Sequence, residues 1–195
     1  MKPIQLTLLT LLCIPAVLFF APRGNSKEQL DGTAPGAELV ARGKYLVDFG
    51  GCNDCHTPLK LTDNGPEPDL TRFLSGHPQD VKLPPPDLKP GPWFAATAGM
   101  TAWAGPWGIS YSPNLTPDKK TGLGAWTEDM FIKAMRTGRH MGYGRPILPP
   151  MPWRGIGGLT DEDLKAVFAY LRTIPAIENQ VPLPVGPDGE VVSYE

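Results

Sequence analysis

Two cysteines and a histidine within five positions carry the clearest chemistry in this sequence. Cys52, Cys55 and His56 form the pattern Cys-Asn-Asp-Cys-His, and this C-x-x-C-H spacing is typical of covalent haem attachment. Two cysteines three positions apart at the start of a helix can each form a thioether to a vinyl group on one edge of the ring. The adjacent histidine then projects its imidazole toward the iron. Because the pattern occurs once, it predicts a single covalently attached haem c.

Other chemistries that use closely spaced cysteines suit the sequence less well. A thioredoxin-like dithiol would follow a β-α-β pattern, which is not evident here. A zinc site would need further cysteine or histidine ligands at short spacing, whereas His77 and His140 stand far from the motif. Three cysteines are also too few for a disulfide framework.

The second axial ligand of the iron has several candidates. Met130 and Met135 fall in an expected helix, where packing is their expected role. Met151 lies in the segment Leu-Pro-Pro-Met-Pro-Trp, whose prolines forbid a helix and present the thioether from a rigid loop. We therefore predict Met151 as the distal ligand, with Met141, a histidine or an open sixth position as alternatives. The full set of candidates is Met100, Met130, Met135, Met141, Met151, His77 and His140.

Three amphipathic helices are expected to position these residues. The first precedes the motif, carries its apolar face on Leu39, Leu46 and Val47, and ends at a Gly-Gly pair before Cys52. The second and third begin at the hydroxyl caps Thr127 and Thr160. Their expected buried residues are Phe131, Ala134 and Met135 in the second helix and Leu164, Val167, Phe168 and Leu171 in the third.

The stretch 57–125 shows no convincing strand alternation and contains many prolines and glycines. Irregular segments of this length are uncommon in compact domains unless they have a function of their own, so we expect this one to wrap the haem. Arg139, Arg145 and Arg154 surround the Met151 loop and could pair with haem propionates. The tryptophans are expected as pocket walls and loop anchors; they are Trp93, Trp103, Trp107, Trp126 and Trp153.

The two ends of the chain differ from its middle. Residues 1–21 combine Lys2 with a long apolar run, which predicts an export signal that is either cleaved or kept as a membrane anchor. A linker over 22–36, a haem domain over 37–178 and an extended tail over 179–195 follow. An extracytoplasmic location, periplasmic in a bacterium, agrees with thioether attachment, which takes place outside the cytoplasm.

The order of these features resembles class I cytochrome c domains over residues 37–175. Within that family, the segments 111–118 (Tyr-Ser-Pro-Asn-Leu-Thr-Pro-Asp) and 121–127 are similar to the cytochrome c subunits of bacterial membrane-bound alcohol and sugar-acid dehydrogenases. Those subunits often carry three haems, whereas this sequence has one attachment motif.

The resemblance implies a mainly α fold, the class I cytochrome c fold, with a long irregular insertion that wraps the haem. It implies that the first and last helices cross where Gly43 permits a close approach, with Tyr45 or Leu46 meeting Phe168 or Leu171. It also implies that Met151 is the distal ligand and that the segment 114–118 lies near the haem.

These features predict an electron carrier and not an enzyme, because His56 and Met151 would close the iron and no catalytic residues are evident beside it. The expected partners are redox proteins, among them a membrane-bound dehydrogenase or oxidase. Nucleic acid is not an expected partner, since the net charge is only -2. The alternatives are an electron-transfer subunit of a larger oxidoreductase complex, or a haem catalyst or sensor with an open sixth site.

Overall fold

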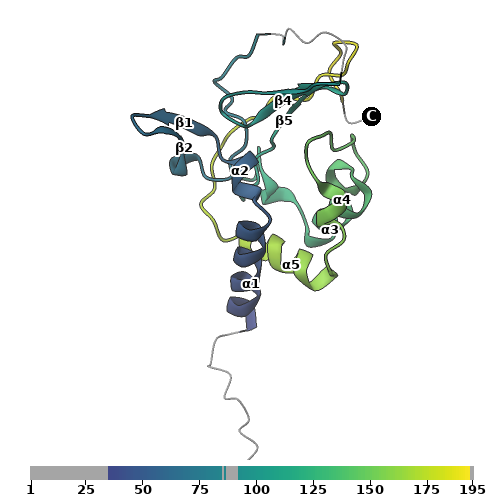
Figure 1. The fold of residues 1–195 in the computed structure, drawn as a ribbon. Coiled ribbons are helices and arrows are strands. Elements are labelled where there is room, and N and C mark those ends of the chain that lie inside the picture. Colours follow the sequence, from purple (N-terminus) through teal and green to yellow (C-terminus); the bar gives the residue numbers. More distant parts are fainter. Residues whose placement is uncertain (1–34, 85, 87–91, 194–195) are drawn as a thin grey trace, which may run out of the picture. The chain divides into compact units, whose positions relative to one another are not determined.

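The computed structural model describes residues 35–84, 86 and 92–193, so the expected export segment 1–21 lies outside the described residues. The helices are α1 (Pro35–Phe49), α2 (Cys52–His56), α3 (Glu128–Thr137), α4 (Trp153–Ile156) and α5 (Asp161–Leu171) (Figure 1). Short 3-10 helices lie at Leu70–Arg72, Leu123–Ala125 and His140–Gly142. Among the described residues, none of the helices has the length and apolar character that a membrane crossing requires.

The first and last helices cross at a glycine, as predicted. A methyl group on Gly43 would overlap the carbonyl oxygen of Ala166 and the side chain of Tyr170, so only glycine permits this approach. The ion pair between Arg42 Nε and Asp163 Oδ1, at 2.8 Å, spans the same crossing. Figure 1 shows α5 lying against α1 below α2, so that the crossing supports the segment that begins at Cys52.

The predicted helix faces form the core. Thr127 and Thr160 cap α3 and α5 through their hydroxyl oxygens, which accept the backbone N–H groups of Met130 and Asp163. Leu46 packs against the core, whereas Tyr45 is exposed and stacks on Phe49 instead. The core cluster consists of Val47, Leu74, Leu123, Phe131, Ala134, Met135, Leu164, Val167, Phe168, Leu171 and Ile174.

The stretch 57–125 contains short strands that its sequence pattern did not reveal. β1 (Leu59–Thr62) and β2 (Gly65–Pro68) form an antiparallel hairpin, and β3 (Ala95–Ala96), β4 (Ala102–Gly105) and β5 (Gly108–Tyr111) form a second antiparallel sheet. These strands have two to four residues, too few for an alternating pattern to be visible. The available signal was the run Asp63-Asn64-Gly65, because these residue types favour turns: Asp63 and Asn64 form the turn, and Gly65 begins β2 with φ +104°.

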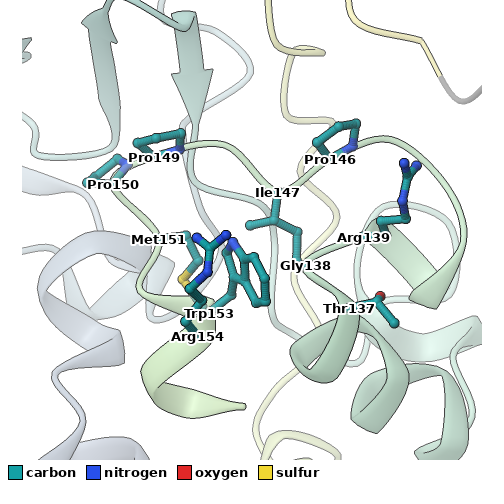
Figure 2. A pocket seen from close by; sticks show the side chains of 10 residues that line it. All are labelled: Thr137, Gly138, Arg139, Pro146, Ile147, Pro149, Pro150, Met151, Trp153 and Arg154. Atoms are coloured by element: carbon teal, nitrogen blue, oxygen red, sulfur yellow. The ribbon is translucent and has the colours of Figure 1, made fainter. Parts of the chain in front are cut away.

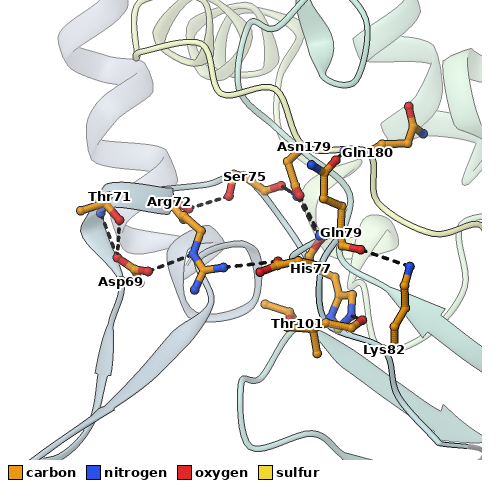
Figure 3. A network of polar contacts seen from close by, with 12 residues as sticks. Asp69, Thr71, Arg72, Ser75, His77, Gln79, Lys82, Thr101, Asn179 and Gln180 are labelled. Atoms are coloured by element: carbon orange, nitrogen blue, oxygen red, sulfur yellow. Dashed lines mark hydrogen bonds and ion pairs between the residues drawn. The ribbon is translucent and has the colours of Figure 1, made fainter.

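Residues 180–193 run back along the second sheet and contact it. Ile109 and Val185 exchange two backbone hydrogen bonds, of 2.7 and 2.9 Å. The buried Asn179 side chain donates to the carbonyl oxygens of Ser75 and His77 and accepts the N–H of Gln79. Figure 3 shows this network, which joins the end of the chain to the loop that follows the hairpin.

A candidate haem-binding site

The four predicted haem ligands and attachment residues line one cavity. Its volume is about 390 Å³, and Cys52, Cys55 and His56 contribute to its lining together with Met151. The rest of the lining is mainly apolar and comes from the end of β5, the segment 112–115, α3 and the loop 147–152. We call this space the haem cavity. The structure therefore brings together two segments that lie far apart in the sequence.

His56 is held in one orientation by a backbone carbonyl. Its side chain is buried, with 4% of its surface exposed, and its Nδ1 lies 2.8 Å from the carbonyl oxygen of Pro113. A hydrogen bond donated by Nδ1 leaves Nε2 with the lone pair that a metal requires. Burial lowers the pKa of His56 to about 4, so the ring is neutral at physiological pH and suited to bind iron.

A buried asparagine fixes the segment that carries this carbonyl. Asn114 Nδ2 donates to the carbonyl oxygen of Ile177 at 2.8 Å, and its Oδ1 accepts the N–H of Thr116 at 2.9 Å. The segment 113–116 is thereby tied to the chain after α5. The family resemblance placed 114–118 near the haem, but the role of Pro113 was missed. Every residue has a backbone carbonyl, so the sequence does not show which carbonyl contacts the histidine.

The two cysteines occupy the first and fourth positions of α2. Gly51 precedes them with φ +63°, a left-handed conformation that favours glycine and allows the sharp entry into the helix. Burial raises the pKa of Cys52 to about 11 and also raises that of Cys55. A reactive dithiol needs a depressed thiol pKa, so this environment does not favour the thioredoxin-like alternative.

Met151 lies on a loop that is held by two hydrogen bonds just before the methionine. Ser110 Oγ donates to the carbonyl oxygen of Pro149 at 2.5 Å, and the N–H of Ile147 donates to the carbonyl oxygen of Gly138 at 2.8 Å. The Met151 side chain is partly buried and packs against the core cluster. The loop thus presents the thioether to the haem cavity from a defined position.

The other candidate ligands divide into two groups. Met135 and His140 also line the haem cavity, but Met135 belongs to the core cluster and His140 packs edge-on against Trp126, with ring centres 4.8 Å apart. His77 is buried elsewhere, where its Nδ1 meets Thr101 Oγ1 at 2.9 Å. Three methionines are not part of the cavity lining; they are Met100, Met130 and Met141.

The aromatic and basic residues also separate by position. Trp103 and Trp126 line the haem cavity as predicted, and Tyr111 was not anticipated. Trp93 is instead 81% exposed. Of the three arginines around the loop, Arg145 is the one that lines the haem cavity.

The haem cavity fits a covalently attached haem in its donor set. It offers two thiols beside an oriented neutral imidazole, a thioether from a separate loop, and apolar walls for a flat macrocycle. In the described part of the chain, no cluster of three or more His, Cys, Asp or Glu residues is placed to hold a metal ion directly. The zinc alternative therefore has no ligand set among those residues.

The comparison with known proteins defines the family. The family described as cytochrome c matches residues 40–175, and this chain belongs to that family. Its cofactor is covalently bound haem c, and the fold is the mainly helical class I cytochrome c fold with irregular loops.

Similar curated proteins are larger than this chain. The fructose dehydrogenase cytochrome subunit of Gluconobacter japonicus is 32% identical over 151 residues, which is 74% of this chain and 24% of that protein. The gluconate 2-dehydrogenase cytochrome c subunit of Pantoea cypripedii is 34% identical over 68% of this chain and 22% of its own length. The cytochrome c subunit of the quinone-dependent alcohol dehydrogenase of Gluconobacter oxydans is 28% identical over 74% of this chain and 24% of its own length. This chain thus spans about a quarter or less of these relatives.

Proposed function

We propose that this chain is a monohaem electron carrier. Its haem c is attached through Cys52 and Cys55, and its iron is held between His56 and Met151. The observation that supports the proposal most strongly is that these four residues, from separate parts of the sequence, line a single apolar cavity. The single C-x-x-C-H motif supports one haem per chain.

The roles of the residues follow from their contacts. When bound, haem supplies a one-electron iron couple. The Pro113 carbonyl holds His56 in the tautomer that binds metal, while the neutral thioether of Met151 favours the reduced iron and raises the potential. His56 and Met151 would together hold the iron and leave it no position for a substrate. The chain would then exchange single electrons with a partner protein and would not itself be an enzyme.

The partner and location are proposed from the relatives and from the sequence. The relatives are cytochrome subunits of fructose and gluconate dehydrogenases, so we propose a membrane-bound dehydrogenase or oxidase as the partner. The haem domain, residues 37–178, works outside the cytoplasm after export through residues 1–21, which are either removed or kept as an anchor. Copurification of a dehydrogenase with the tagged chain distinguishes a complex subunit from a free carrier.

Replacement of Met151 tests the proposed ligation. We expect the oxidised holoprotein to be low-spin and to show the weak long-wavelength band of a thioether bound to Fe(III). Met151→Ala should abolish that band and give a high-spin spectrum, because the sixth position opens. Absorption spectra of both oxidation states measure this, and the mass of the intact protein counts the haems.

Met141→Ala is the matched control, because Met141 belongs to the same part of the chain but does not line the haem cavity. Its spectrum should match the wild type. If Met151→Ala keeps the thioether band, Met151 is not the ligand. If the wild type is high-spin, the iron is open, and a haem catalyst or sensor becomes the better description.

A further inference from the structure

A second cavity lies on the outer side of the Met151 loop. It has a volume of about 410 Å³ and is lined by parts of the segments 137–139 and 146–154. We call it the outer groove. Figure 2 shows it, with Arg139 on one side and Arg154 beside Trp153 and Met151 on the other. Nothing in the proposed ligation of the haem uses this space.

The outer groove and the haem cavity share one wall. Four residues of the loop, namely Ile147, Pro149, Pro150 and Met151, line both spaces. A molecule seated in the outer groove therefore touches the loop that carries the proposed axial ligand.

The charged groups of the outer groove are Arg139 and Arg154. Across the described ranges, no carboxylate lies within ion-pair distance of either arginine. Both side chains are nevertheless positioned. Arg139 donates to the carbonyl oxygen of Gly144 at 2.9 Å, and the Arg154 guanidinium lies 4.5 Å from the centre of the Trp153 ring.

Asp161, at the start of α5, pairs with Arg136 of α3 at 2.5 Å and so does not pair with the groove arginines. Among the described residues, the two guanidinium groups thus leave a positive charge without a carboxylate partner beside an apolar floor of proline, isoleucine and tryptophan. Neither Arg139 nor Arg154 lines the haem cavity, so the propionates are not their geometric partners.

We propose that the outer groove is the docking site of the redox partner, which inserts a polypeptide segment carrying a carboxylate flanked by apolar side chains. The carboxylate meets the Arg154 guanidinium through charge-assisted hydrogen bonds, and Arg139, on the other side of the groove, attracts it at longer range. The apolar flanks cover Trp153 and the proline loop. One electron passes between the partner's redox centre and the iron across the Met151 loop. This assignment rests on the proposed electron-carrier function.

Oxidation of the reduced holoprotein by small redox reagents tests the charge requirement. Each encounter transfers one electron from Fe(II) to hexacyanoferrate(III), an anion, or to tris(phenanthroline)cobalt(III), a cation. In the variant Arg139→Gln/Arg154→Gln, stopped-flow rates at low ionic strength should fall about three- to tenfold with the anion. The rate with the cation should stay the same or rise, and the difference should shrink as salt is added.

Lys60→Gln/Lys119→Gln is the matched control, because it also removes two exposed positive charges but from outside the outer groove. It should change the rate with the anion less than twofold. An equal slowing in both variants would mean that net charge alone governs the rate and would overturn the proposal.

A short peptide tests whether the occupant is a polypeptide. Acetyl-Leu-Glu-Leu-amide should shift the NMR signals of Trp153 and Gly138 in the holoprotein and slow oxidation by hexacyanoferrate(III), whereas the glutamine analogue should do neither. Both effects should disappear in the arginine double variant. If the acidic peptide has no effect while the small anion does, the groove is a site for small anions and the docking proposal fails.

Two further readouts separate this proposal from the function on which it rests. The arginine double variant should keep the thioether band and the midpoint potential of the wild type, since the arginines lie outside the haem cavity. A shifted potential or weakened haem retention would make them propionate partners and overturn the docking role. A wild type without the thioether band would instead contradict the proposed ligation.

Discussion

His56 and Met151 reach the same cavity from two different kinds of scaffold. His56 ends a helix, is almost fully buried, and is oriented by a carbonyl within a segment that Asn114 ties to the chain after α5. Met151 lies in a loop that is partly exposed and has a cavity on each side. The comparison indicates that one side of the site provides rigidity, while the other provides both a ligand and access for a partner.

The largest effect is expected on the His56 side. Asn114→Ala removes the hydrogen bonds to Ile177 and Thr116 and leaves buried groups unsatisfied. The free energy of unfolding should fall by about 2–3 kcal/mol, measured by urea unfolding of the holoprotein. Asn64→Ala, on the exposed hairpin turn, is the control and should cost less than about 1 kcal/mol. Equal losses of stability in both variants would contradict the role of Asn114 in making the His56 side rigid.

An effect of intermediate size is expected on the Met151 side. It should appear as easier replacement of Met151 by an added ligand at the iron. Ser110→Ala removes the hydrogen bond that holds the Pro149 carbonyl, so the loop should release the iron more readily. If the state in which Met151 binds the iron loses about 1 kcal/mol of stability, the apparent affinity for added imidazole rises about fivefold. Spectroscopic titration of the oxidised protein measures this affinity. Ser75→Ala, whose hydroxyl donates to the Arg72 carbonyl oxygen away from the loop, should leave it unchanged.

The smallest effect concerns the pH dependence of stability at Asp69, which precedes the 3-10 helix Leu70–Arg72 after the first hairpin. The Thr71 hydroxyl, and after it Arg72, hold the pKa of Asp69 below its usual value. A depressed carboxyl pKa stabilises the fold above the ordinary pKa, and this stability is lost as the pH falls through the folded value. Because Arg72 is partly exposed, we expect a contribution of only about 1 kcal/mol.

Urea unfolding at neutral pH and at about pH 3, on the wild type and Asp69→Asn, measures this contribution. The variant should be less stable than the wild type at neutral pH, and the difference in their free energies of unfolding should become smaller in acid. A difference that stays constant with pH would show that the charge of the Asp69 carboxylate does not contribute to stability.

The helices were predictable because local rules decide them. Thr127 and Thr160 are caps whose hydroxyls accept the N–H three residues on, and the apolar faces that follow are the buried faces. The strands were missed because β3, β4 and β5 are short, and β4 is buried over most of its length instead of alternating. Strand pairing depends on contacts between separate segments of the chain, and the periodicity of a single segment does not reveal those contacts.

Part of the candidate site was predictable in the same way. The motif at 52–56 and the proline-flanked Met151 are recognisable by residue type and spacing. The sequence did not single out Arg145 from Arg139 and Arg154, because all three are basic residues around one loop. Only the fold separates them, by placing Arg145 on the haem cavity and the other two on the outer groove.

Residue types and their local spacing were thus enough to predict the attachment chemistry, the family and the helices, because thioether spacing and helix capping depend on residues a few positions apart. Long-range packing instead sets which carbonyl orients His56, which arginine faces the haem cavity, and that one loop borders two spaces. These properties depend on distances between segments far apart in the chain, which are set by the packing of α1 against α5 and of the loops around them.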